Sequence, residues 1–184
     1  MKKLAKIKIK KIKVDYTWII KIFFISFVIS MLFSLTAETV IHNVDMVFSI
    51  LIIILFIIIG VVFDMIGVAV AASDEKPFHS MNSKKLHGSK TAIYLIKNAE
   101  KVSSFCNDVI GDISGIVSGS AGAVIALNLA NEYYGNSFIY SLIITSLIAS
   151  FTIGGKALGK SYAINHSEYI VYEFAKLISI FKTN

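Results

Sequence analysis

Several polar side chains lie in or beside segments that are otherwise apolar, and their types suit the binding of a metal cation. Asp64 interrupts the apolar run 47–72, and Asn107, Asp108 and Asp112 lead into another apolar run. A charge in a membrane span costs about 2.5–3.5 kcal/mol on insertion scales, so each such residue is a functional candidate. Carboxylate, amide and hydroxyl oxygens are ligands for hard cations such as Mg²⁺. The candidate ligands are therefore Asp112, Asn107, Asp64, Asp108, Ser73 and Ser114.

The spacing of the carboxylates predicts that they meet at one level of the membrane. Asp64 precedes Ala72 by eight residues, so it lies ~12 Å from the inner end of its helix. Asp112 lies about one turn into the next span, and Asp108 lies one turn before it on the same face. Neighbouring antiparallel helices would bring Asp64 and Asp112 to the same leaflet. The sequence thus predicts a shared carboxylate site near the cytosolic leaflet.

Each carboxylate also has a structural interpretation, and these alternatives stay open at this point. Asp108 suits the N-cap of the third span, where it would accept from free backbone N–H groups. Asp112 can form an ion pair with Lys156, near the end of the fourth span. Asp64 can form a hydrogen bond between helices that serves packing alone.

The elements that must position these residues are membrane helices. The chain has 184 residues, of which 55% are hydrophobic and 16% are charged, whereas soluble domains carry about 25% charge. A helix needs about 20 apolar residues to cross the hydrocarbon core. Four segments qualify, so we predict an all-α integral membrane bundle that forms one domain, 17–184, after a basic N-terminus, 1–16. The predicted spans are 17–36, 47–72, 109–130 and 137–157.

Lysines set the expected orientation. They are numerous before the first span, between the second and third spans, and after the fourth, whereas the other two linkers contain no Lys or Arg. The positive-inside rule therefore places both termini in the cytoplasm of a multi-pass cell-membrane protein. The basic segment 1–16 fits a topology signal that touches anionic lipid headgroups better than a nucleic-acid site. A cleaved signal peptide is the second interpretation of this segment.

The cytoplasmic segment 73–105 contains an amphipathic pattern. Apolar residues recur at helical spacing in SKTAIYLIKNAEKVSSF, with lysines on the other side. This pattern predicts one juxtamembrane helix that lies along the inner membrane surface and positions the third span. The apolar positions are Ala92, Leu95, Ile96, Ala99, Val102 and Phe105.

Small residues recur every four positions at the start of the third span, at Gly111, Gly115, Gly119 and Ala123. Such rows let helix backbones approach closely. The lone Cys106 is expected to be a packing residue. We find no nucleophile and base set in the sequence and expect no enzymatic activity.

These motifs, taken in order, resemble the transmembrane domain of the cyclin-M/CorB–CorC family of magnesium transporters. The resemblance covers about residues 47–181 and rests on IGDISGIVSG, on HGSKTAIYLIKN and on GGKALGKSYAINHSEYIVYEFAKLISIF. Gly154 and Lys160 fall at the ends of the family's Gly-Glu-x-x-Pro-Lys motif, with one extra residue between them. Asn165 and Glu168 match the turn before an amphipathic C-terminal helix. The words DEKPFH and CNDVIGDI are similar to short CorB-like bacterial proteins that lack CBS modules.

The resemblance implies a homodimeric transporter of divalent cations, Mg²⁺ or Co²⁺. Its Ile-Gly-Asn motif, whose amides help to bind Mg²⁺, corresponds to Ile110–Asp112. The chain departs from the family motif at Gly155, which replaces the glutamate, and at Gly159, which replaces the proline. These departures keep a second hypothesis open, in which the chain is an accessory or scaffold membrane protein that has the fold without a working ion site.

Overall fold

The computed structural model describes residues 16–43 and 45–182, and the regular secondary structure of this part of the chain is helical. Four of its helices are long and apolar enough to cross a membrane. The predicted all-α class and the four long apolar helices are therefore confirmed. Within the predicted basic N-terminus, residues 1–15 lie outside the described residues.

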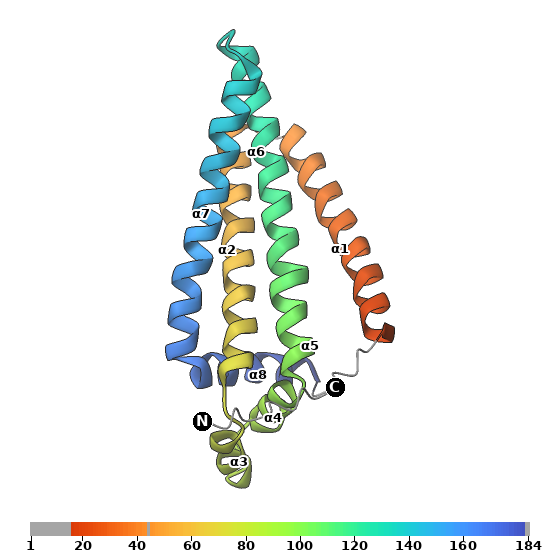
Figure 1. Ribbon diagram of the computed structural model, residues 1–184, viewed down its shortest axis with the longest axis vertical. Coiled ribbons are helices and arrows are strands. Elements are labelled where there is room, and N and C mark those ends of the chain that lie inside the picture. The colour runs from red at the N-terminus through yellow and green to blue at the C-terminus, as the bar shows by residue number, and fades with distance from the viewer. Residues whose placement is uncertain (1–15, 44, 183–184) are drawn as a thin grey trace, which may run out of the picture.

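Four long helical segments run side by side along the molecule (Figure 1). They are α1 (Tyr16–Asn43), α2 (Met46–Ala72), α6 (Asp112–Glu132) and α7 (Ser137–Asn165). Helix α2 packs against α6 and α7. Its 27 residues extend over ~40 Å, which exceeds the thickness of ~30 Å of a hydrocarbon core.

Three shorter helices gather at one end of the bundle (Figure 1). They are α3 (Lys76–Ser83), α4 (Ser89–Lys97) and α8 (Ser167–Lys182), and α8 lies across the ends of the long helices. Val171 and Ala175 of α8 are fully buried against α4, where Ala92 is also fully buried. The apolar stripe of α8 thus closes a core beneath the bundle, while its other side carries polar residues.

The third long helix begins earlier than predicted. Residues Ala99–Glu132 form one candidate span of 34 residues, which consists of α5 (Ala99–Ser104), the π-helix η1 (Phe105–Gly111) and α6. The predicted start at residue 109 is therefore wrong, because Val102, Phe105 and Cys106 extend the apolar pattern backwards. The N-cap interpretation of Asp108 is also wrong, since its backbone lies inside a continuous helix.

The predicted amphipathic helix is divided at Asn98. Asn98 adopts φ −109° and ψ 28°, and its side-chain amide donates to the Tyr94 carbonyl oxygen at 2.8 Å. Asparagine favours such breaks because its side chain competes for backbone hydrogen bonds. Only 89–97 forms the separate helix α4, and the last part of the pattern joins the third span. The fourth span likewise runs beyond the predicted 157 to Asn165 and so includes Lys160.

Small residues allow α2 and the third span to approach closely. In the predicted row of small residues, this approach occurs at Gly111. A Cβ atom on Gly60 would lie 3.3 Å from the Gly111 carbonyl oxygen and 3.1 Å from the Ser114 Cβ. Gly119, in contrast, has nothing within 4 Å of an added Cβ. The close approach is therefore confined to the end of the span that carries the candidate site.

Candidate functional site

Asp64 is the most deeply buried carboxylate among the candidates. The residue is 3% exposed, in the middle of a stretch of α2 that faces both α7 and the π-helix. Its Oδ2 atom lies 3.6 Å from Lys160 Nζ and makes no hydrogen bond. A buried carboxylate is costly unless hydrogen bonds and a counter-charge compensate it. Here the compensation comes from one lysine whose side chain is 49% exposed.

Asn107 lies in the π-helix and contacts α2 at Gly67, three residues after Asp64. A Cβ atom on Gly67 would overlap the Asn107 side-chain oxygen, so the amide lies directly against the α2 backbone. The Oδ1 atom is buried without a hydrogen-bond partner, while Nδ2 faces Ser103 Oγ at 3.4 Å. Residues three apart share a helix face, so Asn107 contacts α2 at Gly67 on the face that also carries Asp64.

The π-helix explains how a polar amide reaches this position. An i→i+5 turn inserts an extra residue into a helix, and such turns are frequent at functional sites. The segment 105–111 contains Asn107 and Asp108 and ends at Gly111, whose backbone lies against Gly60 of α2. No spacing rule based on 3.6 residues per turn predicts this shift, so the sequence did not indicate it.

Asp112 forms the predicted ion pair with Lys156. Lys156 Nζ lies 3.1 Å from Asp112 Oδ1, and the exposed fractions of the two side chains are 18% and 65%. The structural alternative for Asp112 is thereby confirmed as a contact. Asp112 and Asp64 each pair with a different lysine of α7, and Lys156 and Lys160 are one turn apart.

The sequence analysis named Lys160 only as the end of a motif and did not predict its pairing with Asp64, because it ended the fourth span at residue 157. The available signal was the row of small residues at Gly154, Gly155 and Gly159, which continues the helix past that point. Two lysine ammonium groups of α7 therefore stand where a cation attracted by Asp64 and Asp112 would approach.

The remaining candidates are less central. Asp108 is exposed and accepts a hydrogen bond of 2.6 Å from Ser104 Oγ. Ser114 is 3% exposed and contacts the Gly60 position. Ser73 caps α2 and donates to the Ala69 carbonyl oxygen at 2.8 Å. It is nine residues from Asp64, or ~14 Å along the helix, which is too far for both to ligate one ion.

Within the described residues, no group of three or more His, Cys, Asp or Glu side chains is placed to hold a metal ion. Asp64 is the one buried carboxylate among the candidates. The Asn107 amide and the Ser114 hydroxyl lie against the same helix, at the Gly67 and Gly60 positions. One carboxylate with neutral amide and hydroxyl oxygens is a donor set that suits Mg²⁺ or Ca²⁺.

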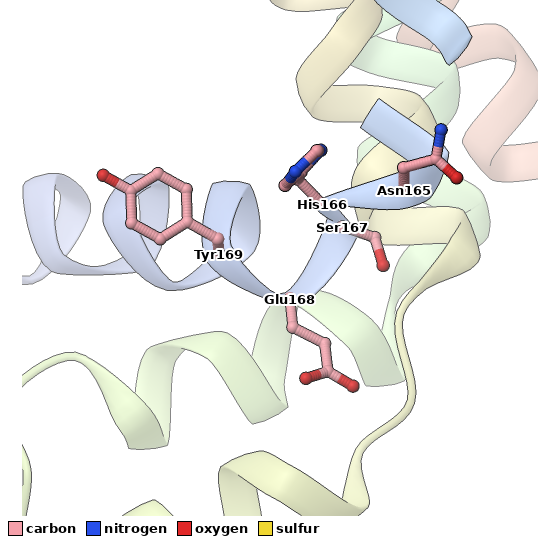
Figure 2. A pocket seen from close by; sticks show the side chains of 5 residues that line it. All are labelled: Asn165, His166, Ser167, Glu168 and Tyr169. Carbon is pink, nitrogen blue, oxygen red and sulfur yellow. The ribbon is translucent and has the colours of Figure 1, made fainter. Parts of the chain in front are cut away.

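A separate open pocket lies at the bend between α7 and α8 (Figure 2), lined by the consecutive residues 165–169. The side chain of Asn165 donates to the Ser161 carbonyl oxygen, and that of His166 contacts the Tyr162 carbonyl oxygen, both on the last turn of α7. Glu168 points away from them toward α4 (Figure 2). The bend is therefore a helix junction at which Asn165 and His166 bond their own helix.

Searches of protein-family models, curated proteins and solved structures find no match for this chain.

Proposed function

We propose that this chain is a multi-pass membrane protein that binds a divalent cation, most simply Mg²⁺, at the junction of α2, the π-helix and α7, and moves it across the membrane. One observation carries the proposal. Asp64 Oδ2 and Asn107 Oδ1 are both buried without a hydrogen-bond partner, and Asn107 contacts α2 at Gly67, three residues after Asp64. Buried acceptors in proteins almost always have partners. A cation would supply one to both.

The lysines of α7 then act as internal counter-ions. Lys160 lies beside Asp64, and an arriving Mg²⁺ would displace its ammonium group from the carboxylate. Lys160 is half exposed, so it has room to move away. Asp112 and Asp108 are exposed on the same helical segment and would attract cations toward the junction, with Lys156 restraining Asp112.

The lysine distribution supports placing the α3, α4 and α8 end of the bundle in the cytoplasm of a cell-membrane protein. The site would then open toward the cytosolic leaflet. A homodimer is part of the proposal, because α7 exposes a long apolar face that includes Leu147, Phe151 and Leu158.

The second candidate function is a membrane scaffold or accessory subunit without transport. The two ion pairs from α7 favour it, since Asp112 and Asp64 each already have a positively charged partner. In this case the lysines hold the helices together and no cation replaces them.

Mg²⁺ flux into proteoliposomes, followed with a trapped Mg²⁺-sensitive dye, separates these functions. Transport predicts flux in the wild-type protein, its loss in Asp64→Asn, and a strong decrease in Asn107→Ala. Ser73→Ala is the matched control, because its hydroxyl bonds its own helix far from Asp64, and it should retain flux. Flux that Asp64→Asn leaves intact would overturn the site, and no flux in the wild type would favour the scaffold.

A further inference from the structure

A second pocket, unrelated to the carboxylates, lies near the same end of the bundle and encloses about 390 Å³. Its lining comes from α1, α2, α4, the third span and α8, and most of the surface that it exposes is apolar. Phe63, Phe105, Phe174 and Ile178 provide much of this apolar lining. The pocket is thus a long-range product of the fold, built from segments that are far apart in the sequence.

One residue that lines this pocket, Lys101, carries a positive charge. Lys101 lines the pocket and is exposed, and its Nζ atom lies 5.1 Å from the centre of the Trp18 ring. Ammonium groups over indole rings keep their charge and are held in place by the contact. Lys97, one turn earlier, is also exposed. The pocket therefore combines an apolar interior with a cationic edge.

We infer that this pocket binds an anionic phospholipid, with one acyl chain against the phenylalanines and the phosphate beside Lys101. Charge complementarity selects this occupant, because lysines near a membrane surface attract anionic headgroups. The inference rests on the proposed membrane placement and is independent of the cation site.

Trp18 makes the inference directly measurable, because it is the only tryptophan in the chain and it lines the pocket. Lipids with brominated acyl chains quench tryptophan fluorescence on contact. The protein is reconstituted in phosphatidylcholine vesicles that contain a low fraction of brominated phosphatidylglycerol or of brominated phosphatidylcholine. We expect the brominated anionic lipid to be preferred about fivefold, which corresponds to ~1 kcal/mol.

Matched variants distinguish lipid binding in this pocket from attraction of anionic lipid to the basic surface as a whole. Lys101→Gln should abolish the preference for the anionic lipid, and Lys101→Arg should keep it. Lys97→Gln removes an equal charge from a neighbouring exposed position that does not line the pocket, and it should keep most of the preference. Val102→Phe fills the pocket and should lower quenching by both brominated lipids. Each variant is normalised to its own fluorescence in unbrominated vesicles, because Lys101 contacts the Trp18 ring.

Equal quenching of the wild type by the two lipids would overturn the inference. Equal losses in Lys97→Gln and Lys101→Gln would also overturn it, since they would show attraction to the whole basic surface. Asp64→Asn is expected to keep the lipid preference. The lipid preference is therefore expected even if the protein proves to carry no Mg²⁺ flux. Equally, the absence of a lipid preference would not bear on Mg²⁺ flux.

Discussion

Lys160 Nζ lies 3.6 Å from Asp64 Oδ2, across the contact between α7 and α2. The carboxylate is almost completely buried and the lysine is half exposed, so the pair joins the bundle interior to its surface. At the proposed site, a bound cation has to take the place of the Lys160 ammonium group beside Asp64.

Lys160→Gln should lower the stability of the cation-free protein and make added Mg²⁺ more stabilising. Loss of one partner of a buried ion pair costs about 3–5 kcal/mol, and the exposure of Lys160 reduces the expected loss to about 1–3 kcal/mol. Thermal unfolding in detergent, with and without MgCl₂, measures both effects. A ligand that binds only the native state raises its melting temperature.

Lys176→Gln is the matched control, because its side chain is also 49% exposed and its partner Glu173 lies at 4.0 Å on the surface of α8. This variant should lose less than ~1 kcal/mol. A Mg²⁺ response of Lys160→Gln no larger than that of the wild type would contradict the role of Lys160 as a displaceable counter-ion.

Gly67→Ala should destabilise the bundle, because the new methyl group would overlap the Asn107 amide oxygen against α2. Overpacking of this kind costs about 1–3 kcal/mol. Gly154→Ala is the control, since an added Cβ there has nothing within 4 Å and alanine favours helix by up to ~1 kcal/mol. Unfolding midpoints should therefore move in opposite directions, and equal midpoints would refute the close approach at Gly67.

The Asp112–Lys156 pair should contribute little to stability despite its distance of 3.1 Å. Asp112 is 65% exposed, and exposed ion pairs contribute about 0.2–1 kcal/mol. A double-mutant cycle with Asp112→Asn and Lys156→Gln measures the coupling directly. A coupling well above 1 kcal/mol would mean that this pair, rather than the Asp64 pair, holds α7 in place.

The proposed orientation predicts opposite labelling of two loops. In a Cys106→Ala background, a cysteine at Tyr134, which is 97% exposed, should react with a membrane-impermeant maleimide added to intact cells. A cysteine at Ser83, which is also exposed, should react only after the membrane is permeabilised. The reverse labelling pattern would invert the topology and move the candidate site to the outer leaflet.

The helices and their approximate positions were predictable from local composition. Long runs of Ile, Leu, Val and Phe leave few alternatives to apolar helices, and carboxylates inside such runs can be recognised from the sequence. The Asp112–Lys156 contact was accordingly predicted and is confirmed, whereas the roles of Asp64 and Asn107 as ligands stay predictions. The resemblance to magnesium transporters remains a hypothesis that the flux experiment tests.

Helix ends were predicted less well, because they depend on small differences between helix propensity, side-chain hydrogen bonds and packing. Asn98 divides a pattern that is amphipathic throughout, and α7 continues through glycines that usually weaken a helix. Packing between helices explains the second case, since Gly159 is buried and allows α7 to lie close to Met65 of α2. Tertiary packing therefore overrides the low helix propensity of glycine.

The sequence by itself determined that this protein has four long apolar helices and that acidic residues lie within or beside them, because the length and hydropathy of a segment are local properties. Only the tertiary structure decided that Lys160 faces Asp64, that a π-helix directs Asn107 onto Gly67, and that five separate segments enclose a pocket around Lys101. Those contacts depend on the rotation and axial offset of packed helices, which follow from the fit of whole surfaces rather than from any single segment.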